Sequence, residues 1–186
     1  SGYNAYHVKP LEGSAYVQNV FEYDDIIVNA GLRYDYWDPN ALLPVNLRAK
    51  TDTDNGIRLD SELEAGVARS QLSPRFGLAY PISDNGAIHV SYGHFFQLPR
   101  FNAIYNNYEY EIKLGGLQTT MGNVNLKPEK TIGYEIGIQQ QLSLVYGLEL
   151  TMYYKDISNL LSQEIISTID EKVYARYINR DYGNVR

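Results

Sequence analysis

The sequence predicts an all-β protein, an antiparallel up-and-down transmembrane β-barrel segment. The first observation is an alternation over residues 26–37. One parity carries Ile26, Val28, Ala30, Leu32, Tyr34 and Tyr36, and the other carries Ile27, Asn29, Gly31, Arg33, Asp35 and Trp37. Successive side chains of a strand point to opposite faces, so this strand has one apolar and one mostly polar face. The second observation is that short and long connections alternate along the chain, which is typical of outer-membrane barrels.

Composition narrows the class of protein. The chain has 186 residues, a net charge of −6 and no cysteine. One domain fits this length, and the charge gives no basic surface for nucleic acid. The absence of cysteine excludes a disulfide framework and a thiolate metal site. No apolar run is long enough for a spanning helix, although a barrel needs none. The 18 tyrosines suit membrane interfaces and ligand-contacting loops.

The first expected pair of strands covers residues 14–23 and 26–37. Asp24-Asp25 makes the tight turn between them, and the odd positions of the earlier strand are apolar except Asn19. A long loop rich in Asp, Asn, Pro and Glu follows over residues 38–72.

The second expected pair covers residues 74–80 and 87–96, which show the same alternation. Ser83-Asp84-Asn85-Gly86 predicts a hairpin turn, because Asn-Gly tolerates the positive φ that such turns need. A second long loop is expected over residues 97–129. Loops of such length are uncommon in compact domains unless they are functional.

The third expected pair covers residues 131–142 and 148–155, with a short link between them. A loop and a seventh strand over residues 174–186 complete the chain, and the alternation in that last strand assigns no face. All short links therefore fall at one end of the sheet and all long loops at the other.

The two faces of these strands carry different residues. The polar parity contains Gly31, Gly77, Gly93, Gly133 and Gly137. Strand glycines indicate either a close approach by another backbone inside the barrel or the relief of crowding on a concave wall. The apolar parity is expected to face lipid. The residues assigned to lipid are Ile26, Val28, Leu32, Ile136, Ile138 and Leu150.

Several segments resemble a known family. Residues 72–99 begin with L-S-P-R-F-G-L-A-Y and end with S-Y-G-H-F-F-Q-L-P, and residues 122–137 are G-N-V-N-L-K-P-E-K-T-I-G-Y-E-I-G. These motifs are similar to the barrel of TonB-dependent outer-membrane receptors. Residues 15–39, 148–161 and 177–186 match the same barrel in the family's order. The resemblance spans nearly the whole chain.

This resemblance implies a barrel of about 22 strands that is plugged by an N-terminal globular domain. Residues 1–186 are then expected to be a partial barrel domain of about seven strands, a fragment that lacks the plug and the closing strands. The resemblance also implies location in a Gram-negative outer membrane. Its function would be import of a scarce nutrient, of the siderophore, vitamin, glycan or peptide class. The implied partners are outer-membrane lipid, the nutrient and the TonB energy-transducing complex, which would contact the missing N-terminal part.

The second long loop holds the candidate ligand contacts. They are Tyr105, Asn106, Tyr108 and Tyr110. Tyrosine and asparagine supply rigid contact area and adaptable hydrogen bonds, as in other binding loops. The alternative is that these side chains pack loop against loop or lie at the membrane rim.

No metal, cofactor or catalytic site is expected. Residues 52–56 (D-T-D-N-G) are similar to a calcium loop, but glycine comes one place too early. The histidines are His7, His89 and His94; His89 lies on the polar parity and His94 on the apolar parity, so they do not converge within their strand, which disfavours a metal site. The chain shows no nucleophile–base pairing and no phosphate loop, and we expect that it is not an enzyme.

Two other functions are consistent with the alternation. The first is a small complete outer-membrane barrel with a structural or adhesive role. The second is a soluble β-sandwich that binds a ligand, which would need the apolar face of residues 26–36 buried against a second sheet.

Overall fold

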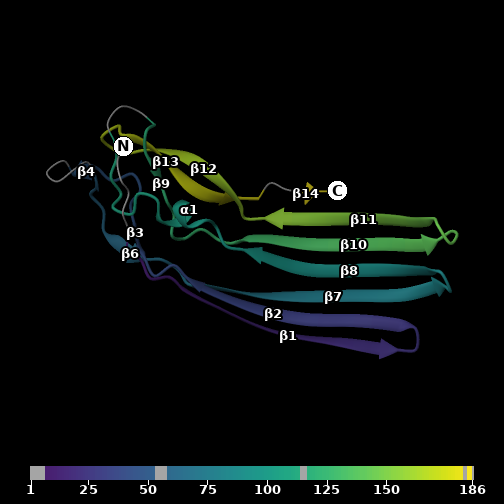
Figure 1. Cartoon of the computed structure of the whole chain (residues 1–186). Coiled ribbons are helices and arrows are strands. Elements are labelled where there is room, and N and C mark those ends of the chain that lie inside the picture. Colours follow the sequence, from purple (N-terminus) through teal and green to yellow (C-terminus); the bar gives the residue numbers. More distant parts are fainter. Residues whose placement is uncertain (1–6, 53–57, 114–116, 182–183, 186) are drawn as a thin grey trace.

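The computed structural model of the protein describes residues 7–52, 58–113, 117–181 and 184–185. Its main feature is a long antiparallel sheet in the order β1-β2-β7-β8-β10-β11-β14 (Figure 1). The strands are β1 Leu11–Tyr23, β2 Ile26–Asp38, β7 Arg69–Ser83, β8 Gly86–Gln97, β10 Glu129–Gln141, β11 Gly147–Ser158 and β14 Asn184–Val185. The all-β class and the first six expected strands are confirmed; each is longer than expected at one end or both, and β10 ends one residue earlier than expected, at Gln141.

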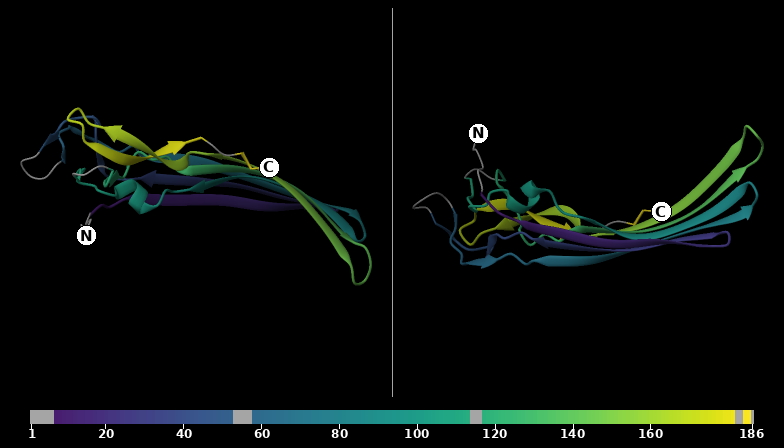
Figure 2. Two further views of the ribbon diagram at one scale, coloured as in Figure 1. Left: turned by 90° about the horizontal axis from the view of Figure 1, so that it is seen from above. Right: turned by 60° about the horizontal axis from the view of Figure 1, so that its bottom comes forward.

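The tight turns lie at one end of this sheet and the longer connections at the other (Figure 1). Asp24 has a φ of 50°, which closes the turn between β1 and β2. The turn between β7 and β8 contains a register shift between Pro81 and Ser83. Figure 2 shows that the sheet twists and curves along its length, as a segment of barrel wall does.

The longer connections contain further secondary structure. Two small two-stranded sheets lie between β2 and β7. They pair β3 Leu42–Pro44 with β6 Leu63–Ala65, and β4 Thr51–Asp52 with β5 Arg58–Leu59. A three-stranded sheet pairs β12 Leu160–Ser167 with β13 Val173–Arg180, and β13 with β9 Thr120–Met121. The short helix α1 spans Phe101–Tyr105. These elements gather at one end of the long sheet (Figures 1 and 2), and we call them the loop assembly.

The buried core lies in the loop assembly and in the adjoining end of β2. One hydrophobic cluster contains Trp37, Ala41, Leu43, Ala103, Ile104, Tyr105, Val124 and Leu126. A second contains Leu59, Ile112, Met121, Ile166 and Tyr174. Residues from connections far apart in the sequence thus pack together. The loops form a structure of their own instead of separate solvated segments.

The expected seventh strand is wrong in its extent. Residues 173–180 belong to β13, which forms a hairpin with β12, and β14 pairs with β11 only at residues 184–185. Residues 182, 183 and 186 lie outside the described part of the chain. The sequence predicts a loop over residues 160–167, but the structure forms the strand β12 there. Its hairpin forms because Ile166 and Tyr174 become buried in the second cluster, a non-local event that a local pattern does not reveal.

The long sheet is open, with β1 and β14 at opposite edges. A complete small barrel is therefore not formed by the described strands. The small sheets lie at one end of the long sheet (Figures 1 and 2). Apolar side chains of the long strands, such as Leu32, Ile136 and Leu150, stay exposed, contrary to the sandwich alternative. In the ranges that the structure describes, no helix is long and apolar enough to span a membrane.

Candidate functional site: a polar wall beneath a loop assembly

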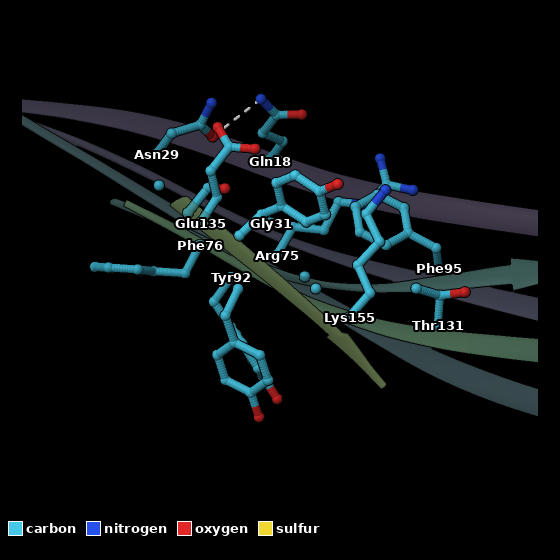
Figure 3. Close-up of a pocket in the computed structure, with 16 residues that line it drawn as sticks. Gln18, Asn29, Gly31, Arg75, Phe76, Tyr92, Phe95, Thr131, Glu135 and Lys155 are labelled. Carbon is cyan, nitrogen blue, oxygen red and sulfur yellow. Dashed lines mark hydrogen bonds between the residues drawn. The ribbon is translucent and has the colours of Figure 1, made fainter. Parts of the chain in front are cut away.

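A hollow of about 680 Å³ lies on the polar face of the long sheet. Its lining includes Gln18, Asn29, Arg75, Glu135 and Lys155, which come from five different strands. Figure 3 shows these side chains on one side of the sheet and Phe76 and Tyr92 on the other. The alternation of the sequence thus produces one wall that carries charge, glycine and amide groups. We call this face the polar wall.

One cross-strand row forms the floor of the hollow. Pairing between neighbouring strands places Gln18, Gly31, Arg75, Gly93, Gly133 and Lys155 in register across the sheet. The glycines have no side chains, so the ring of Phe95 can lie against Gly93 and Gly133. A Cβ atom at position 93 would be 3.2 Å from the ring, and one at position 133 would be 3.4 Å away.

Two cations of this row contact aromatic rings. The guanidinium carbon of Arg75 lies 5.1 Å from the centroid of the Phe95 ring. The Nζ atom of Lys155 lies 5.5 Å from the centroid of Tyr153. Such cation–π contacts restrain a long side chain without neutralising its charge.

Glu135, the carboxylate that lines the hollow, contacts a histidine and not one of these two cations. Oε1 of Glu135 lies 3.7 Å from Nε2 of His89. In the same part of the wall, the imidazole of His89 covers Gly137. The hollow is therefore lined by two restrained cations and by Glu135, whose partner His89 lies next to the hollow on the same wall.

The opposite face carries the six residues expected to face lipid. Register places Ile138 beside both Ile88 and Leu150, and Ile136 beside both Val90 and Met152. Leu32 and Leu150 are 39% and 57% exposed, so neither is buried in the described structure. Ile26 and Val28 lie on the same side, because Val28 pairs with Leu78, which in turn pairs with Val90. Contact with lipid itself remains a prediction.

An aromatic row crosses this apolar face. Tyr92 and Tyr134 have ring centroids 5.1 Å apart, and those of Tyr134 and Tyr154 are 6.0 Å apart. The hydroxyl of Tyr92 lies 2.6 Å from Nε2 of His94. This hydrogen bond gives the tyrosine a polar partner on a face that is otherwise apolar.

The structure places Tyr105 and Asn106 inside the loop assembly. Tyr105 is the last residue of α1 and is 1% exposed. Its hydroxyl donates a hydrogen bond to the carbonyl oxygen of Pro39 at 2.8 Å. Nδ2 of Asn106 donates to the carbonyl oxygen of Thr120 at 2.5 Å. The Tyr105 bond joins two separate connections, whereas the Asn106 bond lies within the connection between β8 and β10. Tyr105 would reach a nutrient only if the loop assembly opened.

Tyr108 and Tyr110 are half-buried and pack against the first hydrophobic cluster. Their ring centroids are 6.4 Å apart. The hydroxyl of Tyr110 donates to the carbonyl oxygen of Leu42, and burial raises the pKa of this phenol. The alternative that these tyrosines pack loop against loop describes their observed contacts, while a contact with ligand remains a prediction for all four residues.

Sequence reasoning missed the residues that organise the loop assembly. Trp37 lies on the polar parity of β2, yet it is 2% exposed because the loops cover the end of that strand. Tyr174 is fully buried and donates to the carbonyl oxygen of Leu47 at 2.6 Å, and burial raises its pKa to about 12. Burial also lowers the pKa of Arg176, whose Nη2 donates to Oδ1 of Asn123 at 3.0 Å. The only feature of the sequence that could have indicated this buried cluster is the position of the single tryptophan at the end of a strand.

No metal-binding group was expected. Among the described residues, no set of three or more His, Asp and Glu side chains could hold a metal ion. Residues 53–56 of the segment that is similar to a calcium loop lie outside those residues.

Comparison with known proteins bears on the whole chain. A family model for the β-barrel of TonB-dependent receptor-like proteins matches residues 2–186. A search of curated protein sequences gave no match.

Solved structures share the fold at low sequence identity. The Serratia marcescens hemophore receptor HasR, solved with its hemophore HasA and heme, has a TM-score of 0.66 and 17% identity, covering 92% of this chain and 30% of that chain. The Neisseria meningitidis iron transporter FrpB (F3-3 variant) has a TM-score of 0.57 and 17% identity, covering 94% and 22%. The Pseudomonas aeruginosa ferric enterobactin receptor PfeA (G324V mutant) has a TM-score of 0.54 and 13% identity, covering 92% and 31%.

The chain thus spans less than a third of each of these structures. The matched family consists of transport receptors of Gram-negative outer membranes and not of enzymes. The match of the family model over residues 2–186 includes every strand of the long sheet and the whole loop assembly. The chain belongs to the TonB-dependent receptor β-barrel family.

Proposed function

We propose that the full-length protein is an outer-membrane receptor that imports a scarce nutrient with energy from the TonB complex. Residues 1–186 would be one part of a larger, plugged barrel in the outer membrane of a Gram-negative bacterium. The nutrient would belong to the siderophore, vitamin, glycan or peptide class.

One observation carries this proposal, namely the difference between the two ends of the long sheet. Tight turns close one end, and a packed loop assembly with two hydrophobic clusters covers the other. Between them lies a wall with a charged face and an exposed apolar face. A barrel built from such a wall can contact lipid outside and a solute inside, while its folded loops contact the solute first.

The half-buried residues Asn106, Tyr108 and Tyr110 are the loop positions that we propose for nutrient contact. The loop assembly holds them in fixed positions, which reduces the entropy that ligand binding would otherwise cost.

Uptake and binding assays in a deletion strain test the proposal. Cells that carry the full-length gene should take up a labelled nutrient from a panel of these four classes, and cells without the gene should not. Removing the TonB partner should abolish uptake but leave binding at the cell surface intact. Partner-independent flux of small solutes at the rate of an open porin would contradict the proposal.

A further inference from the structure

The geometry points to a seat for a carboxylate on the polar wall, formed by Arg75 and Lys155. This inference rests on the proposed function to the extent that the polar wall encloses a lumen. The carboxylate would come either from another segment of the full-length chain or from a soluble ligand, and both sources share the same chemistry.

The first step of the argument is the position of the two cations. Arg75 and Lys155 belong to one cross-strand row, in which Gly93 and Gly133 separate them. Neighbouring strands are about 4.8 Å apart, so the two Cα atoms are roughly 14 Å apart across a floor without side chains. Figure 3 shows both long side chains on the same side of the sheet as Phe95.

The second step is that both charges are restrained but not neutralised. Arg75 lies on the ring of Phe95 and Lys155 on the ring of Tyr153. Within the described residues, neither cation has a carboxylate oxygen within 4.0 Å. Glu135, the carboxylate that lines the same hollow, lies against His89 instead.

The third step concerns the ligand that fits this arrangement. A guanidinium presents a planar fork of donors that matches a carboxylate, and an ammonium adds a compact point charge. The contacts with aromatic rings fix part of the rotamer freedom before a ligand arrives, so less entropy is lost on binding.

Carbodiimide coupling in the full-length protein tests the seat. This reagent activates a carboxylate, which an amine in contact with it then attacks to form an amide, while the carbodiimide takes up the departing oxygen and leaves as a urea. Isolated outer membranes that contain the full-length receptor are treated, digested and analysed by mass spectrometry. We expect an amide product at Lys155. Lys130 is the matched control, because it lies on the face of the sheet opposite to Lys155 and should form no product with the same carboxylate.

Two variants of Arg75 distinguish a carboxylate that is bound by both cations from one that lies near Lys155 by chance. Arg75→Lys places an amine in the seat and should add a product at position 75 with the same carboxylate. Arg75→Gln should lower the yield at Lys155 by roughly threefold or more, because one of the two attracting charges is gone. Heat-modifiable mobility in electrophoresis shows which variants remain folded.

The mass of the product identifies the source. Two linked peptides of the receptor assign the carboxylate to the chain, and a small added mass on the Lys155 peptide assigns it to a soluble ligand. The seat is overturned if Lys155 stays unmodified, if it couples only to Glu135, or if Arg75→Gln leaves the yield unchanged. Loss of uptake with an intact Lys155 product would overturn only the proposed function, and normal uptake without the product would overturn only the seat.

Discussion

The imidazole of His89 occupies the space that a side chain at Gly137 would need. The two residues are cross-strand partners in β8 and β10, and a Cβ atom at position 137 would overlap Cε1 and Nε2 of the ring. The ring also lies 3.7 Å from Glu135. A side chain at position 137 would thus force the His89 ring to move from this place on the polar wall.

Gly137→Ala is expected to destabilise the full-length protein by about 1–3 kcal/mol, because the His89 ring must leave its position. Gly77→Ala is the matched control on the same wall, since its nearest neighbours would be 3.8 and 4.0 Å from the new Cβ atom. Urea unfolding of purified protein in lipid vesicles measures both. Adding His89→Ala to Gly137→Ala should restore most of the loss, and failure to do so would contradict the steric explanation.

Ile136→Arg should reduce the stability of the intact barrel by about 2–4 kcal/mol if position 136 lies near the bilayer midplane. Gln139→Arg is the control, because Gln139 lies on the polar wall and already contacts Glu149 at 3.2 Å. Folding into vesicles of defined thickness measures the difference. Equal stability of the two variants would mean that the faces are wrongly assigned.

Tyr105→Phe should loosen the loop assembly by about 1 kcal/mol, since the carbonyl oxygen of Pro39 loses its buried donor. Tyr108→Phe serves as the control within the same loop. Hydrogen exchange of α1 and of residues 37–43 measures the local effect. If α1 exchanges at the same rate in both variants, the Tyr105–Pro39 bond does not stabilise the assembly.

Deleting residues 102–110 should reduce nutrient binding and leave barrel assembly intact, because these residues add nothing to the ladder of the long sheet. The deletion also removes Ala103, Ile104 and Tyr105 from the first cluster and uncovers Trp37. We therefore expect faster proteolysis of the remaining loops on intact cells, together with unchanged heat-modifiable mobility. Loss of that mobility would show that the loop contributes to barrel folding.

Acid should weaken the contact between the β12–β13 turn and the connection after β3. Hydrogen bonds from Thr51 and Thr168 lower the pKa of Asp170 from its ordinary value of 3.8 to about 2. A depressed pKa stabilises the fold above the ordinary value, and this contribution is lost as the pH falls from 3.8 to about 2. The protection factors of residues 167–172 against hydrogen exchange should therefore fall over this range, and Asp170→Asn should have lower protection factors at neutral pH with no such step.

Some features of the fold followed from the sequence because they depend only on neighbours in the chain. Alternation between Ile26 and Trp37 defined two faces, and Asn85-Gly86 marked a turn that the structure contains. The expected strand at Pro74 began too late, because proline often opens a strand. In the structure β7 begins at Arg69, and Pro74 pairs with Leu32 within the ladder.

The candidate site depended more on contacts between distant residues. Tyr105 is a residue type that often contacts ligands. Its burial depends on two distant residues: Trp37 packs in the same cluster, and the carbonyl oxygen of Pro39 accepts its hydrogen bond. Likewise, Phe95 and Arg75 are each ordinary in sequence, and only the register of β7, β8 and β10 places a ring over glycines beside a cation.

The sequence by itself determined the class of fold, the two faces of each long strand and the end of the sheet at which the tight turns lie. These properties repeat every second residue or occur within a few residues of a turn, so local patterns express them. Only the tertiary structure decided that residues 160–180 form a hairpin, that the loops share two hydrophobic clusters, and that Arg75 and Lys155 share one row. Packing and register between distant strands set those features, and local alternation carries no information about which distant partner a strand will meet.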